Sequence, residues 1–215
     1  MWAFDYSTLS TTFRMQSNIT RTQWWLIYGA PAKPLILLYP HQDSDISVKL
    51  HYAEGFSASF PRYDDLIHWW SIHAHPDGTL EDNNTHQETY GLFWEWYPTQ
   101  TQWDLSEGCV VKGSDIREFL YGKLTELGLN TKERSDFITF WYPRLQNYRY
   151  LQITFAGKEY TDMAQLEIVP HPESLLRVFM IAQPLEYKKI IPPQNIQKFE
   201  RRGFTVVEWG GAIIE

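Results

Sequence analysis

The sequence predicts a single α+β domain, predominantly antiparallel β and sandwich-like, with a helical hairpin inserted around residues 113–147. Three observations favour this class. Short runs of alternating apolar and polar residues fill residues 22–112, the apolar spacing changes to the helical period over 113–147, and alternating runs resume over 148–211. Because strands are expected on both sides of the helical segment and no low-complexity linker separates them, residues 22–215 should form one domain, preceded by an N-terminal extension at 1–21.

The first β region contains six expected strands, separated by residues typical of turns. They cover residues 24–28, 35–39, 46–52, 67–75, 90–97 and 109–112. Pro31, Pro34 and Pro40 and the tetrapeptides HPDG and EDNN lie between them, and such residues favour turns. In residues 46–52 apolar side chains alternate with polar ones, which predicts a strand with one buried and one solvated face.

The middle of the chain predicts two helices. Ser114 can cap the first helix, which carries an apolar stripe, and Gly128 can end it in a left-handed turn. Asn130 and Glu133 have the spacing of a capping box, which opens the second helix. Pro143 is expected to stop that helix, because proline lacks a backbone N–H and clashes with the preceding turn. The two helices should pair as a hairpin.

Four strands are expected after the hairpin, at residues 148–155, 166–169, 175–182 and 204–209. The stretch IIPPQN should be a stiff connector, because its two prolines restrict the backbone. Gly210 and Gly211 follow the last expected strand, and no helix follows them. We therefore interpret this Trp-Gly-Gly end as a turn or a frayed end and not as a phosphate-binding loop.

The composition excludes several classes of function. The formal net charge is −7, whereas a protein that binds the nucleic acid backbone needs clustered lysine and arginine. No apolar run approaches the roughly 18 residues that span a bilayer, and residues 1–20 lack the pattern of a secretory leader. We expect a soluble chain, cytoplasmic as written, with no nucleic acid partner and no membrane insertion. Cys109 is the only cysteine, which excludes an internal disulfide and a thiolate zinc site.

Several stretches, taken in order, resemble those of a known family. They are KPLILLYP, HPDGTL, YGLFWEW, RVFM and RRGFTVVEWGG, and together they resemble a family of uncharacterised microbial domains. Members of that family usually belong to secreted or surface-attached bacterial proteins, so the resemblance implies an exported or cell-surface location. It implies no established activity, catalytic residue or cofactor.

Two glutamates stand among apolar and aromatic residues, which raises the question of catalysis. Glu95 lies in the stretch FWEWY and Glu208 in VVEWGG. Two carboxylates about 5 to 9 Å apart, one of them in an apolar pocket, can serve as the acid and the nucleophile or base of a glycosidase. The alternative is structural. Glu208 and Arg177 are each the single charged residue on an apolar stripe, so a cross-strand ion pair would satisfy both.

The histidines are the second candidate for chemistry. His73 and His75 are two residues apart in an expected strand and therefore lie on one face of it. Such a pair can ligate a metal ion, and His68, Asp77 or His86 could supply a further ligand. The alternative is a solvated strand end that runs into the Pro-Asp-Gly turn. The sequence contains no signature motif of nucleotide or cofactor binding, so no cofactor is expected.

Aromatic residues, which make up 16% of the chain, are the third candidate. Neighbouring large rings on a strand point to both faces, so some of them should be exposed unless both faces are covered. Exposed ring clusters bind ligands and protein partners. The binding residues expected on this basis are Trp69, Trp70, Trp94, Trp96 and Tyr97.

The sequence thus favours a noncatalytic binding or assembly module that presents an aromatic-rich surface to a protein or carbohydrate partner. One alternative is a carbohydrate-active hydrolase that uses Glu95 and Glu208 as paired carboxylates. The other is a structural subunit of a larger complex.

Overall fold

The computed structural model describes residues 31–52, 55–64, 68–96 and 101–214. The expected N-terminal extension and the expected strand at residues 24–28 lie outside these ranges, and so does Tyr97.

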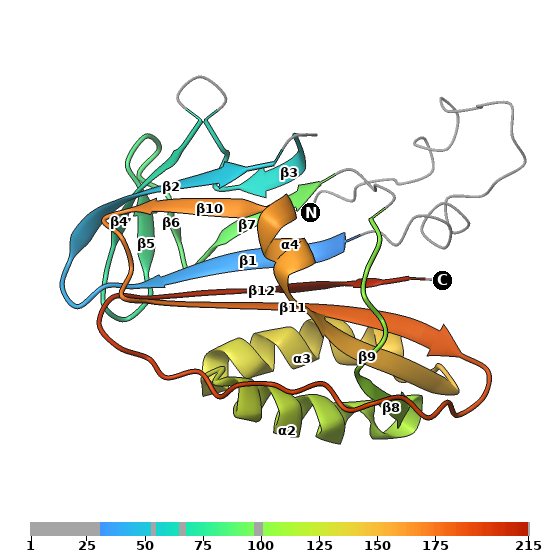
Figure 1. Ribbon diagram of the computed structural model, residues 1–215. Coiled ribbons are helices and arrows are strands. Elements are labelled where there is room, and N and C mark those ends of the chain that lie inside the picture. Colours follow the sequence, from blue (N-terminus) through green and yellow to red (C-terminus); the bar gives the residue numbers. More distant parts are fainter. Residues whose placement is uncertain (1–30, 53–54, 65–67, 97–100, 215) are drawn as a thin grey trace, which may run out of the picture.

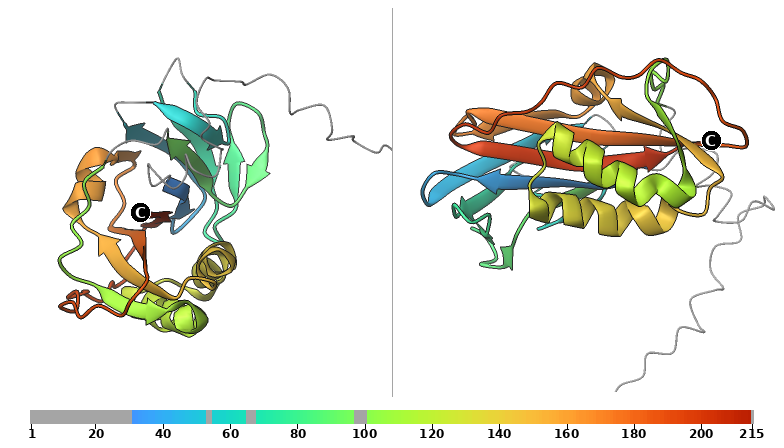
Figure 2. Two further views of the ribbon diagram at one scale, coloured as in Figure 1. Left: turned by 90° about the vertical axis from the view of Figure 1, so that its right-hand side faces the viewer. Right: turned by 90° about the horizontal axis from the view of Figure 1, so that it is seen from below.

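Three layers make up the described part of the chain. The helices α2 (Ile116–Leu127) and α3 (Thr131–Leu145) cover one face of a seven-stranded sheet, and a five-stranded sheet lies over the opposite face (Figures 1 and 2). Most strand pairs in the larger sheet are antiparallel, and so are the pairs described in the smaller one. The expected fold class, α+β with a sandwich of sheets and a helical hairpin, is therefore confirmed.

The strands of the larger sheet come from both sides of the helical hairpin. In spatial order they are β3 (Phe56–Phe60), β7 (Leu92–Trp96), β1 (Pro31–Tyr39), β12 (Thr205–Ile213), β11 (Ser174–Leu185), β9 (Tyr150–Ala156) and β8 (Cys109–Lys112). The smaller sheet has the order β10 (Gln165–Val169), β2 (Ser44–His51), β4 (Trp70–Ala74), β5 (Leu80–Asp82) and β6 (Glu88–Thr89). Because β1 pairs with β12, the first and the last strand of the described chain lie side by side.

Because β11 and β12 are parallel, the chain must return from the end of β11 to the end of the sheet at which β11 began. Residues 186–204 make this return along the helical layer and contain no helix (Figure 1). Ile196 and Phe199 pack against the core on the helix side of the sheet. The side chain of Gln194 bonds the backbone N–H and C=O of Phe155 at 2.9 and 2.6 Å. The returning segment is thus tied to the sheet by both apolar and polar contacts.

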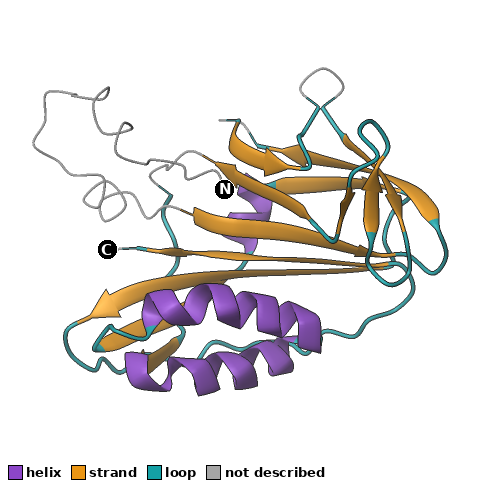
Figure 3. Ribbon diagram, turned by 180° about the vertical axis from the view of Figure 1, so that it is seen from behind, coloured by secondary structure: helices purple, strands orange, loops and turns teal. Residues whose placement is uncertain are grey.

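Two apolar cores lie on the two faces of the larger sheet. Along β12, Val207 and Trp209 belong to the core on the helix side, whereas Val206 and Glu208 face the smaller sheet. Figure 3 shows the helices on one side of this sheet and the smaller sheet on the other. A central strand that is covered on both faces needs apolar residues on both, which is why the stretch FTVVEW is almost continuously apolar.

Both expected helices are present, and their junction is capped as the sequence predicts. Gly128 ends α2 in the left-handed conformation, with φ of 96°. The side chain of Asn130 accepts from the backbone N–H of Glu133, and the Glu133 carboxylate accepts from the backbone N–H of Asn130, which completes a capping box. Asn130 and Glu133 thereby satisfy backbone donors at the start of α3.

The outer ends of the two helices differ from expectation. Ser114 does not cap α2, because it lies in a 3-10 turn and its hydroxyl bonds the carboxylate of Asp115 at 2.7 Å. Pro143 does not stop α3, which continues to Leu145. Proline removes only one N–H there, and the backbone N–H of Gln146 still donates to the helix at 3.0 Å.

The sequence also misses several elements. It does not predict the short strands β3, β5 and β6 or the short helix α4 (Lys158–Met163). The interpretation of the Trp-Gly-Gly end as a turn or frayed end is wrong, because β12 runs through Gly210 and Gly211. A Cβ atom on Gly211 would lie 2.5 Å from the carbonyl oxygen of Met180 and 2.8 Å from the ring of Trp141. Glycine therefore allows the neighbouring strand and α3 to approach β12 closely.

Candidate functional sites

Glu208 lies in the core between the two sheets, with an exposed fraction of 0%. Its Oε2 accepts a hydrogen bond from Arg177 Nε at 2.5 Å, and its Oε1 accepts one from the indole nitrogen of Trp94 at 3.1 Å. Arg177 is the register partner of Glu208 across the parallel β11–β12 pair. The cross-strand ion pair expected from the sequence is present. Both oxygens of this carboxylate are therefore occupied by structural partners.

Three neighbours hold the guanidinium of Arg177. Besides the bond to Glu208, Nη1 donates to the carbonyl oxygen of Ala164 at 2.6 Å, and the guanidinium lies 4.7 Å from the centre of the Tyr160 ring. Burial opposes the charge of Arg177, but Glu208 and Tyr160 together outweigh this effect and raise the pKa of the arginine. Burial and then Glu208 raise the pKa of Tyr160 well above its usual value. At neutral pH the arginine is therefore charged and the tyrosine neutral.

Glu95 lies on the opposite face of the larger sheet from Glu208. On β7, Trp94 and Trp96 belong to the core between the sheets, so Glu95, which lies between them, points to the helix side. There it accepts a hydrogen bond from the backbone N–H of Lys33 at 3.3 Å. Because the sheet separates the two carboxylates, they cannot flank one glycosidic bond. The alternative hypothesis of a catalytic pair of Glu95 and Glu208 is therefore wrong.

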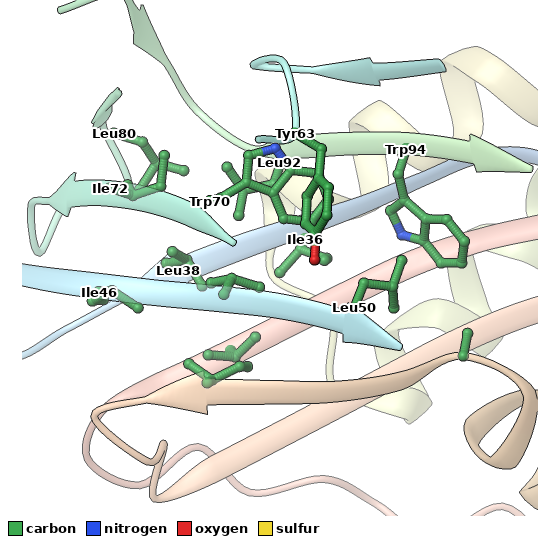
Figure 4. Packing of buried hydrophobic residues seen from close by; sticks show 14 of the residues in the cluster. Ile36, Leu38, Ile46, Leu50, Tyr63, Trp70, Ile72, Leu80, Leu92 and Trp94 are labelled. Carbon is green, nitrogen blue, oxygen red and sulfur yellow. The ribbon is translucent and has the colours of Figure 1, made fainter. Parts of the chain in front are cut away.

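Most of the tryptophans expected on a binding surface are part of the core. Trp70, Trp94 and Trp96 have exposed fractions of 1%, 0% and 3%. Figure 4 shows Trp70 and Trp94 surrounded by apolar side chains of both sheets. For these three the expectation is wrong, because they lie in the core between the two sheets, where each sheet covers the inner face of the other. Trp69 is only partly buried, and Lys49 Nζ lies 5.5 Å from the centre of its ring. Tyr97 lies outside the described residues.

A pocket of about 720 Å³ opens beside the end of β2. Its lining comes from the end of β2, the start of β3, the segment before β4 and the corner between α4 and β10. Figure 1 shows β3 and α4 at the same end of the smaller sheet. This volume is in the range of small-molecule sites.

Three aromatic residues line this pocket and are called the aromatic wall: Tyr52 and Phe56, which are partly buried, and Tyr63, which is buried. The Phe56 and Tyr63 rings meet edge to face, with centres 4.8 Å apart, and the Tyr63 ring meets Trp70 at 4.6 Å. The Tyr52 ring lies 5.5 Å from Trp96. The buried tryptophans thus support the aromatic wall from behind and fix the positions of its rings.

Five polar residues also line the pocket. They are Lys49, His51, His68, Asp162 and Gln165, so the lining residues include one lysine, one aspartate and three residues whose side chains can both donate and accept hydrogen bonds. His51 Nε2 lies 3.0 Å from a carboxylate oxygen of Glu167, which orients its ring. The sequence does not predict this pocket, because its members are drawn from segments more than 100 residues apart.

His73 and His75 lie on the outer face of the smaller sheet, each beside an aspartate. His73 Nδ1 is 2.8 Å from Asp45 Oδ1, and His75 Nδ1 is 3.0 Å from Asp43 Oδ1. The ring centres of the two histidines are 5.1 Å apart. The hydrogen bond with Asp45 is the main reason that the pKa of His73 is raised. His73 and His75 thus lie on one face, as expected, and the carboxylates of Asp45 and Asp43 lie next to them.

The three further ligands considered from the sequence have other partners or positions. His68 lines the pocket. The carboxylate of Asp77 accepts from the backbone N–H of Thr79 at 2.8 Å and so stabilises the turn. His86 Nδ1 lies 2.6 Å from Glu81. Within the described ranges, the group whose ligand atoms lie within 4.8 Å of one another consists of Asp43, His73 and His75.

No family model, no curated protein and no solved structure matches this chain. The resemblance to a family of microbial domains, and the location that it implies, stay predictions. Over the part of the chain that the structure describes, no helix is both long and apolar enough to cross a membrane.

Proposed function

We propose that this chain is a noncatalytic binding module and that the pocket beside β2 binds its ligand, a carbohydrate. The observation that carries the proposal is the lining of the pocket, which combines the aromatic wall of Tyr52, Phe56 and Tyr63 with several polar residues. Aromatic rings offer broad, rigid apolar faces, and the C–H faces of sugar rings can pack on them. The polar groups can then bond the hydroxyl groups at the edge of the sugar.

The charges of the pocket favour an uncharged ligand. Lys49 and Asp162 carry opposite charges, whereas recognition of a phosphate or another strong anion needs several converging cations. His51, His68 and Gln165 can each donate and accept, which suits hydroxyl groups because these do the same. A neutral oligosaccharide meets both conditions.

The buried ion pair supports a noncatalytic role. The hydrolase hypothesis needs Glu95 and Glu208 as its two carboxylates. Both oxygens of Glu208 already accept hydrogen bonds within the core. Glu95 faces the other side of the sheet. Neither group can act as acid or base toward a sugar in the pocket.

The test is calorimetric titration of the chain with cello-, chito-, manno- and xylo-oligosaccharides, together with two variants. Gln165→Trp adds bulk at an exposed pocket residue without removing a core contact. Val169→Trp is the matched control, since Val169 is exposed on the same strand but does not line the pocket. We expect one class of oligosaccharide to bind the wild type and the Val169 variant but not the Gln165 variant.

Two results would contradict the proposal. One is that none of the four oligosaccharide classes binds the wild type. The other is that the Gln165→Trp and Val169→Trp variants bind equally well, because the ligand would then lie outside the pocket.

A further inference from the structure

We propose that Asp43, His73 and His75 form a binding site for a divalent transition-metal ion on the outer face of the smaller sheet. One ligand atom of each residue lies within 4.8 Å of the ligand atoms of the other two. An ion bound about 2.1 Å from tetrahedral nitrogen and oxygen ligands holds those ligands about 3.4 Å apart. The three side chains therefore need only small rotations to close around one ion. All three are partly or fully exposed, which permits such rotations.

The sheet brings these residues together. Antiparallel pairing places Asp45 of β2 opposite His73 of β4, and Ser44 opposite Ala74. The next residues outward are Asp43 on one side and His75 on the other, and their side chains already meet at 3.0 Å. Strand pairing fixes the backbone of His73 and places Asp43 and His75 one residue beyond the last pair, which lowers the entropy that ion binding costs.

A second carboxylate orients the first imidazole. Asp45 Oδ1 lies 2.8 Å from Nδ1 of His73, an arrangement in which the other ring nitrogen, Nε2, carries the lone pair for a metal. At His75 the ion would replace the proton that this ring shares with Asp43. Metal-ligating histidines commonly have such a carboxylate behind them, because it fixes the tautomer and the ring orientation.

The donor set points to a transition metal. Two imidazoles and one carboxylate suit zinc and its neighbours, whereas calcium and magnesium prefer oxygen ligands alone. Glu81 of β5 lies opposite His73 of β4, so its carboxylate adds negative charge near the proposed site. Three protein ligands leave one coordination position open for water or for a group from another molecule.

This site is separate from the pocket. Asp45 stands near the start of β2 and His51 at its end, so six residues of strand, about 20 Å, lie between them. The metal proposal does not depend on carbohydrate binding.

The test is calorimetric titration of the wild type with zinc chloride, with calcium and magnesium chloride as comparison ions. His75→Ala removes one ligand, and Asp45→Asn removes the carboxylate behind His73. His51→Ala is the matched control, because His51 also lies on the outer face of the smaller sheet beside a carboxylate, 3.0 Å away, but is outside the three-residue group. Far-UV circular dichroism verifies that each variant is folded.

We expect the wild type and the His51→Ala variant to bind one equivalent of zinc, and neither to bind calcium or magnesium. Asp45→Asn should weaken zinc binding about tenfold or more, and His75→Ala should weaken it further. The proposal is overturned if the wild type binds no zinc, or if the affinities of the His75 and His51 variants are equal. Visible absorption of the cobalt-loaded wild type should show a low coordination number, and its loss in His75→Ala would locate the ion independently.

Discussion

Replacement of Arg177 by leucine should destabilise the fold strongly, because it leaves Glu208 buried without its counter-charge. Glu208 has no exposed surface. The substitution removes its hydrogen bond from Arg177 and leaves the one from the indole nitrogen of Trp94. The substitution also removes the bond from Arg177 to the carbonyl of Ala164 and the contact with the Tyr160 ring.

The expected magnitude follows from the burial of the pair. The side chains of Arg177 and Glu208 have exposed fractions of 7% and 0%, so solvent screens the pair very little. Breaking such a pair by removing one partner typically costs about 3–5 kcal/mol. In a domain of this size 1 kcal/mol changes Tm by about 2–4 °C, so Tm should fall by about 6–20 °C.

The assay is urea unfolding at pH 7, followed by far-UV circular dichroism, with a thermal scan beside it. Arg117→Leu is the matched control, because Arg117 pairs with Glu118 on the surface, and exposed pairs contribute little to stability. The double variant Arg177→Leu with Glu208→Gln should be more stable than Arg177→Leu alone, since it no longer buries an unpaired charge. If Arg177→Leu is as stable as Arg117→Leu, or if the two core substitutions are additive, the reasoning is refuted.

Three other substitutions test close packing and capping by the same unfolding assay. Gly211→Ala should cost about 1–3 kcal/mol because its Cβ would overlap the carbonyl of Met180, whereas Gly122→Ala, in α2 with open space around its Cβ, should stabilise the fold by up to about 1 kcal/mol. Equal effects at the two glycines would contradict this account of β12. Asn130→Ala should cost about 1 kcal/mol, because the N–H of Glu133 loses its acceptor, and an unchanged unfolding midpoint would show that the cap contributes nothing.

The parts of the fold that the sequence predicts are those with strong local signals. Alternation identifies β2 and β11 because each strand is long enough to show period two. The capping box at Asn130 and the glycine at 128 identify the helix junction, since each acts within one turn of chain. The Arg177–Glu208 pair is predictable for a related reason, because each is the single charge on its apolar stripe.

What the sequence does not predict depends on which surfaces the second sheet covers. Alternation places Trp94 and Trp96 on one face of β7 and Glu95 on the other, but it does not say which face another layer will bury. The tryptophans therefore belong to the core and not to a surface. Short elements such as β5 and α4 are not predicted for a second reason, because three to six residues are too few to show a period.

For the pocket and for the metal-ligand group, too, the sequence predicts the local signals but not the contacts between distant segments. His73 and His75 are two residues apart, so their common face can be predicted, but their aspartate neighbours depend on the register of β2 with β4. The pocket depends on the approach of Tyr52, Phe56 and Tyr63 to the corner between α4 and β10, which follows more than 90 residues later in the chain. Such long-range pairings are a property of the topology and leave no periodic signal in the sequence.

The most direct test of the proposed binding site is a nuclear magnetic resonance titration of the isotopically labelled chain with the four oligosaccharide classes. We expect one class to shift the amide signals of residues 49–52, 55–56 and 162–165, which line the pocket or adjoin its lining, and to leave those of α2 and α3 unchanged. Shifts confined to another face, or no shifts with any of the four, would contradict the assignment of this pocket as a carbohydrate site.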